Sequence, residues 1–248
     1  MRLTLRLPLV ALVGAAVLPG SQIAAQSGPD VARAYREANE ATLVRDFAEL
    51  LSYPNRAHTP EIREAALYIR DQMRAVGVDT ELLEIEGVSP LVLGVLSVPG
   101  ATRTLGVYVH YDGQATDPTN WTHDPFEPTL YTAAMEADGE PLSLPAEGEA
   151  VDPEWRLYAR SAGDDKAPIA AILPVLKSFM EAGVTPTSNV VFMFDGEERR
   201  DRATSARIWR WPRRRWTIST SGCSSTDRLI RVVGHRSPSA FGVRSGWK

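Results

Sequence analysis

The sequence predicts an α/β domain, a three-layer sandwich with a mixed sheet. Short apolar runs bounded by glycine, proline and polar residues predict strands at 80–85, 91–98, 105–109 and 189–194. Runs with helical spacing flank these strands, and that alternation is typical of layered α/β folds. The 248 residues, 44% of them hydrophobic, suffice for the core of one good-sized domain.

The first 25 residues have the pattern of a secretory signal peptide. A short basic start precedes an apolar run at 7–18, and Ala24 and Ala25 provide a small-residue exit. The alternative is an uncleaved membrane anchor, but the apolar run is shorter than the ~20 residues that a span needs. We expect a secreted or periplasmic protein that is not an integral membrane protein after cleavage.

The residues after this leader have the apolar spacing of helices. Residues 29–51 predict one or two amphipathic helices, and the turn at 53–55 ends them. Thr59 and Pro60 predict the start of a second helix, which runs to Val76 and ends at Gly77.

The second half of the domain begins with residues 132–153, which are rich in Glu, Gly and Pro and predict a polar loop. A helix is then predicted after Lys166, with apolar spacing from Ile169 onward and an end at Gly183, and Pro174 is expected to kink it or shorten its first part.

Three motifs with metal-binding side chains follow element ends. His110 ends a strand, and Asp112 comes two residues later. Asp164 and the residue after it open the helix at Lys166, and a Glu pair at 197–198 follows the last strand. Histidine with carboxylates suits zinc and similar divalent ions. The chain has one cysteine, Cys223, so an intramolecular disulfide is excluded.

The order, spacing and flanking residues of these motifs resemble the M20 family of metallopeptidases and deacylases. The resemblance covers about residues 40–198 of the chain. It implies a zinc-peptidase-like catalytic domain, incomplete here and without a lid domain, that cleaves a small peptide or an N-acyl amino acid. Dipeptidase and deacylase are both compatible with the motifs, and a family-type dimer is not expected without the lid.

The resemblance also implies a role for each residue. Two divalent ions are expected, with Zn²⁺ favoured and Co²⁺ or Mn²⁺ as alternatives. Asp164 matches the bridging ligand, and His110 and Glu198 match terminal ligands, one on each ion. Asp112 matches the carboxylate that orients the histidine, and Glu197 matches the general base.

Further expectations concern neighbouring residues. The resemblance implies a cis peptide between Asp164 and Asp165, although Ser161 stands where many members have glycine. His58 is interpreted as a surface-loop histidine. His123 lies in a loop dense with polar residues, where a scaffold role is favoured over metal binding.

Residues 199–248 depart from the family pattern. They hold four of the six tryptophans and a net charge of +11, against −15 for residues 1–198. The favoured interpretation is a frame disruption in the coding sequence after Glu198. A nucleic-acid-binding arm is the alternative, but a signal peptide directs the chain away from nucleic acid.

This departure removes ligands that a complete member needs. Asp227 lies near the distance expected for another acidic ligand but has the wrong neighbours, and His235 comes too early for the distal histidine. Two functions therefore remain: a truncated metallohydrolase, and a non-catalytic fragment with incidental polyanion binding through its basic tail.

The first prediction concerns this tail. Residues 209–225 lack the apolar periodicity that would offset an ordering cost of ~1 to 2 kcal/mol per residue. Limited trypsin digestion should cut first within 199–215 and leave a core that ends near Glu198. A trypsin-resistant tail with protected amides would contradict the prediction.

Overall fold

The computed structural model describes residues 27–198. Four strands form one mixed sheet in the order β1-β2-β7-β3. Their bounds are β1 Asp79–Leu83, β2 Leu91–Leu96, β3 Thr104–His110 and β7 Asn189–Asp195. β2 pairs antiparallel with β1 and with β7, whereas β3 pairs parallel with β7. The predicted α/β class, the mixed sheet and all four predicted strands are confirmed.

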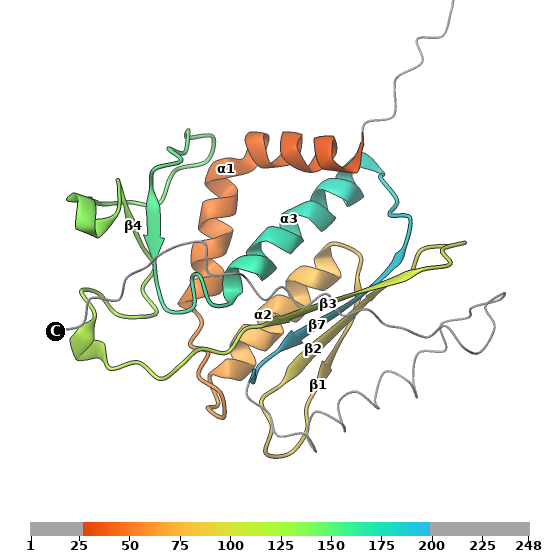
Figure 1. Cartoon of the computed structure of the whole chain (residues 1–248), viewed down its shortest axis with the longest axis horizontal. Coiled ribbons are helices and arrows are strands. Elements are labelled where there is room, and N and C mark those ends of the chain that lie inside the picture. The colour runs from red at the N-terminus through yellow and green to blue at the C-terminus, as the bar shows by residue number, and fades with distance from the viewer. Residues whose placement is uncertain (1–26, 199–248) are drawn as a thin grey trace, which may run out of the picture.

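Three helices cover one face of this sheet: α1 Gly28–Ser52, α2 Ile62–Ala75 and α3 Lys166–Ala182. α1 lies along α3, and α2 lies against the strands (Figure 1). One apolar cluster joins residues of all three helices to Val92, Val109 and Phe194 of the sheet. The other face carries a smaller cluster that includes Leu93 and Met193. A helical layer over that second face is not present among residues 27–198.

The helices follow the sequence patterns with some differences. α1 is one helix with a break in helical dihedrals at Asn39, whose side chain donates to the carbonyl of Tyr35. α2 begins at Ile62 rather than after Thr59, because Pro60 and the residue after it first form a turn. α3 is continuous through Pro174, so the predicted shortening is wrong.

Between β3 and α3 the chain forms a region that the sequence patterns did not resolve. It contains a small sheet in the order β5-β4-β6, formed by β5 Pro141–Leu142, β4 Thr129–Tyr131 and β6 Arg156–Tyr158. Two 3₁₀ turns, Pro118–Asn120 and Met135–Ala137, lie in the same region. The predicted polar loop at 132–153 is therefore partly structured, since strands of two or three residues are too short to show a period.

Two predicted segments lie outside the described residues: the signal peptide at 1–25 and the tail at 199–248. Among residues 27–198, none of the helices is both long enough and apolar enough to cross a membrane.

Candidate metal centre

The ends of β3 and β7 bring two of the three motifs together. The parallel register places His110 opposite Asp195, so both strands end at the same edge of the sheet. The backbone N–H of Tyr111 donates to the carbonyl of Asp195 at 2.7 Å and extends this pairing by one step. The segment with Asp112 therefore lies beside the segment with the Glu pair.

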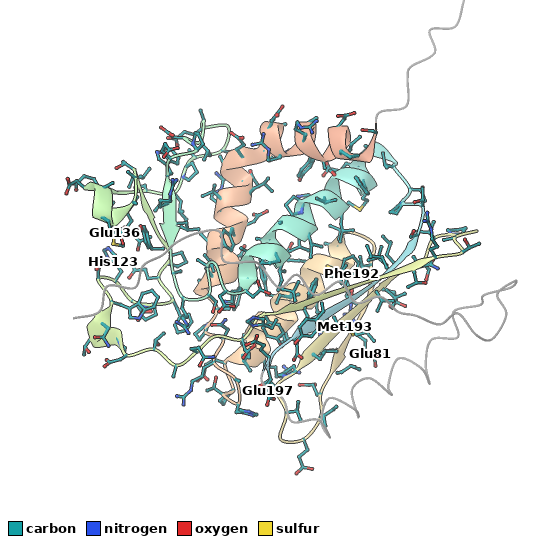
Figure 2. All side chains as sticks on the ribbon, viewed as in Figure 1. Glu81, His123, Glu136, Phe192, Met193 and Glu197 are labelled. Carbon is teal, nitrogen blue, oxygen red and sulfur yellow. The ribbon has the colours of Figure 1, made fainter. Side chains whose placement is uncertain are left out.

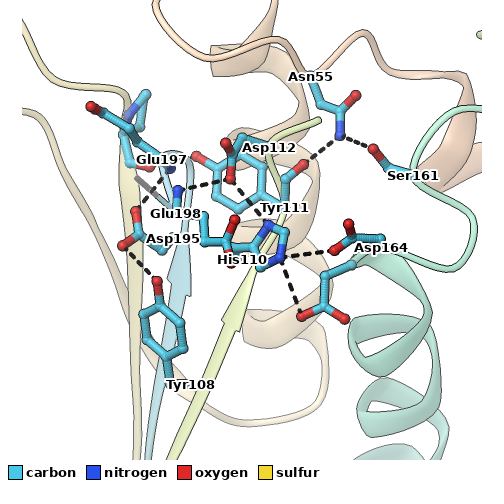
Figure 3. A network of polar contacts seen from close by, with 12 residues as sticks. Asn55, Tyr108, His110, Tyr111, Asp112, Ser161, Asp164, Asp195, Glu197 and Glu198 are labelled. Atoms are coloured by element: carbon cyan, nitrogen blue, oxygen red, sulfur yellow. Dashed lines mark hydrogen bonds and ion pairs between the residues drawn. The ribbon is translucent and has the colours of Figure 1, made fainter. Parts of the chain in front are cut away.

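His110 is at the centre of the polar contacts at this edge (Figure 3). Its side chain is only 13% exposed, and its Nδ1 lies 3.2 Å from Oδ1 of Asp112. Its Nε2 lies 3.1 Å from Oδ1 of Asp164 and 3.9 Å from Oδ2 of Asp165. The histidine thus has the expected orienting carboxylate on one nitrogen and the expected metal-binding carboxylate on the other.

The charges around His110 make this a site of negative potential. Burial lowers the pKa of His110, but the hydrogen bond and charge of Asp112, together with the charges of Asp165 and Glu198, outweigh burial and raise it to about 9. Burial raises the pKa of Asp165, while His110 opposes that shift. Such an excess of carboxylates favours a cation at this point.

The two residues of the Glu pair point in different directions. The backbone N–H of Glu198 donates to Oδ1 of Asp112 at 3.0 Å, and the charge of its side chain acts on His110. Glu197 instead turns away from His110 (Figure 3), and its Oε1 lies 3.2 Å from Nε2 of His58. Its backbone N–H donates to the side chain of Asp195, which fixes the turn after β7.

The two remaining histidines of the described part lie in different surroundings. His58 is 57% exposed, as expected for a surface loop, but the sequence did not predict its contact with Glu197. Its left-handed backbone conformation, with φ of 62°, is uncommon for a residue with a side chain. His123 contacts the hydroxyl of Tyr131 at 2.6 Å and lies apart from Glu197 (Figure 2).

The loop before α3 carries the third motif. The peptide between Asp164 and Asp165 is cis, as the resemblance implies. Lys166 begins α3 fully buried, and its Nζ donates to the carbonyls of Leu50 and Tyr53 at 2.9 and 2.8 Å. Burial lowers the pKa of this lysine to about 7.

Ser161 of the same loop lies against the turn after β3. It has a left-handed φ of 63°, and its hydroxyl accepts a hydrogen bond from Asn55. A Cβ added at Gly113 would collide with the Ser161 hydroxyl oxygen and would lie 3.1 Å from Oδ1 of Asn55. The two loops can approach this closely only because residue 113 is glycine.

The residues present fit one side of a metal site. Two donors bound to one zinc at 2.0 to 2.2 Å lie about 3 to 3.5 Å apart, which matches the distance from His110 to Asp164. Within 27–198, however, no group of three or more His, Cys, Asp or Glu side chains is arranged to hold a metal ion. The described part therefore provides a pair of donors with its orienting carboxylate, and not a complete ligand set.

Comparisons with known proteins agree with these motifs. The profile of Peptidase family M20/M25/M40 matches residues 106–209, which include all three motifs. The Cys-Gly metallodipeptidase of Candida albicans is 28% identical over 152 residues, and that of Schizosaccharomyces pombe is 25% identical over 149. Each match covers 56% of this chain and 27% of the relative. The resemblance to the M20 family is confirmed, and the chain spans about a quarter of these relatives.

Solved structures show the same fold. Human carnosine dipeptidase 1 aligns with a TM-score of 0.57 and 18% identity, over 76% of this chain and 38% of that one. The dipeptidase Dug1p of Saccharomyces cerevisiae aligns with a TM-score of 0.56 and 18% identity, over 75% and 38%. These similarities confirm the fold class of the described residues.

The close approach at Gly113 leads to a prediction. Gly113→Ala should destabilise the protein by about 1 to 3 kcal/mol, because the new methyl group overlaps Ser161 and the loops must separate. Urea unfolding of the full chain measures the loss. Gly163→Ala is the matched control, since a Cβ there meets nothing within 4 Å, and it should change stability by less than about 0.5 kcal/mol. Equal stability of the two variants would contradict the argument.

Proposed function

We propose that this chain is part of a metal-dependent hydrolase of peptide or N-acyl amide bonds. The observation that carries the proposal is the pair formed by His110 and Asp164, 3.1 Å apart, with Asp112 on the other nitrogen of the histidine. Metal-bound histidines generally carry such a carboxylate on the second nitrogen. The pair lies within the segment that matches the M20 family.

Relatives support a small dipeptide as the substrate. They include a Cys-Gly metallodipeptidase and a carnosine dipeptidase, which favours a dipeptide over an N-acyl amino acid. Since this chain spans only 27% of the curated relatives, the whole activity is part of the proposal.

We assign the metal ligands as His110, Asp164 and Glu198, with Asp164 as the bridge between two ions. Zinc is the proposed metal. When bound, such ions polarise the scissile carbonyl and lower the pKa of a bound water toward 7. The chain's own contribution is orientation, because Asp112 holds Nδ1 of His110 and thereby directs Nε2 toward Asp164.

The proposed base is Glu197, which would take a proton from water and deliver it to the leaving amine. In this structure its carboxylate contacts His58, so this role requires the side chain to turn toward His110. The charge of Glu198 already acts on His110, which supports Glu198 as the metal ligand and leaves Glu197 as the base. In the alternative assignment the two glutamates exchange roles, so the assignments differ in which glutamate the metal needs.

Export to the periplasm or out of the cell is supported by the leader pattern at 1–25. The second candidate function, a non-catalytic fragment, is favoured by the incomplete ligand set within the described part of the chain. The metal content of the purified protein distinguishes a non-catalytic fragment from a metal-dependent hydrolase.

Metal retention is therefore the test of the proposed function. The purified full chain, loaded with Zn²⁺ and dialysed, should retain zinc, and His110→Ala should lose it because the nitrogen donor is removed. His123→Ala is the matched control and should retain the wild-type amount, since its ring contacts Tyr131. Elemental analysis gives the stoichiometry. A wild-type chain that holds no zinc, cobalt or manganese above trace would refute the proposed hydrolase function.

Substitution of each glutamate tests the assignment of roles. If Glu197 is the base, Glu197→Gln should keep metal, whereas Glu198→Ala should lose it. In a full-length version with the reading frame restored after Glu198, Glu197→Gln should also lower turnover by ~10² to 10⁴-fold. Equal metal loss in both variants would show that the assignment is wrong.

A further inference from the structure

Residues 53–58, in the connection between α1 and α2, contact all three motif segments. The carbonyl of Tyr53 accepts from Lys166 at 2.8 Å, next to the Asp164 motif. Asn55 accepts from the N–H of Gly113 through its backbone carbonyl at 2.8 Å, after the His110 motif. His58 reaches Glu197 at 3.2 Å.

Asn55 has the most constrained position in this segment. It is fully buried, and its side-chain amide donates to the carbonyl of Tyr111 at 2.5 Å and to the hydroxyl of Ser161 at 2.9 Å. The atom that faces Tyr111 must be the amide nitrogen, because a backbone carbonyl only accepts hydrogen bonds. One side chain thus joins the loop after β3 to the loop before α3.

The carboxylate of Asp164 is not held in place by packing against other side chains. The side chain of Asp164 is 88% exposed, so its place beside His110 follows from the backbone of its loop. That loop is held at one end by the bond from Asn55 to Ser161 and at the other by the buried Nζ of Lys166. Release of either end lets the distance from Asp164 to His110 vary.

From these contacts we propose that residues 53–58 position the three motif segments relative to one another, with Asn55 as the principal positioning residue. Its effect on metal binding rests on the proposed function, but its effect on the loops does not. Asn55 touches neither His110 nor Asp164 in this arrangement, and it acts through Tyr111 and Ser161.

Hydrogen exchange of the metal-free full chain tests the positioning role. Asn55→Ala removes both hydrogen bonds, and Asn55→Leu removes them with little change of shape, in case the alanine variant fails to fold. In either variant the backbone amides of 111–113 and 159–166 should exchange at least about tenfold faster than in the wild type, and the exchange rates of α2 should not change. Asn189→Ala is the matched control, since its Oδ1 accepts from the N–H of Val98 at the other end of β7.

Metal binding provides the second measurement. Visible absorption of added Co²⁺ reports coordination geometry, so the Asn55 variants should bind it about tenfold more weakly or with an altered spectrum, whereas Asn189→Ala should match wild type. A wild-type chain that fails to bind Co²⁺ or Zn²⁺ refutes the proposed function, and hydrogen exchange then decides the positioning role alone. Unchanged exchange at both loops, or an equal increase across α2, would overturn it.

Discussion

The parallel pairing of β3 with β7 is the constraint on which the candidate site depends. Its register sets His110 opposite Asp195, so the residues that follow both strands begin at one edge of the sheet. A parallel pair needs a crossover connection, and here that connection contains α3, with the Asp164 motif in the loop just before the helix. One topological feature therefore brings together three motifs that are far apart in the sequence.

Strand register alone does not fix the loops that carry the side chains. Those loops lie beyond the regular hydrogen bonding of the strands. Hydrogen bonds from buried polar side chains, chiefly Asn55 and Lys166, hold them instead. A buried ammonium is costly unless its hydrogen bonds are made, and Lys166 makes them to carbonyls at the end of α1. Carbonyls in the last turn of a helix and at its C-cap have no partner within the helix, so these bonds satisfy both the carbonyls and the ammonium group of Lys166.

Sequence patterns predicted the parts whose signals are local. The strands have apolar runs, and His110 and Asp112 stand at a strand end where a ligand motif is expected. The contact of His58 with Glu197 spans 139 positions and has no local pattern, so an exposed turn was the natural interpretation. The sequence likewise indicated only a turn at Asn55, because its contacts are with residues far along the chain. The direction of Glu197 was missed because adjacent residues in a turn leave little sequence signal for their orientation.

The number of ligands limits what residues 27–198 can do. A catalytic zinc site generally has three protein ligands and one open position. In the proposed site His110 and Asp164 would supply two, and Glu198 would be the third once its carboxylate joins them. A second ion would share Asp164 in the proposed site but would need further donors, and the carboxylate of Glu197 contacts His58. The described part thus offers up to three donors for one ion, whereas a two-ion site would require donors from elsewhere.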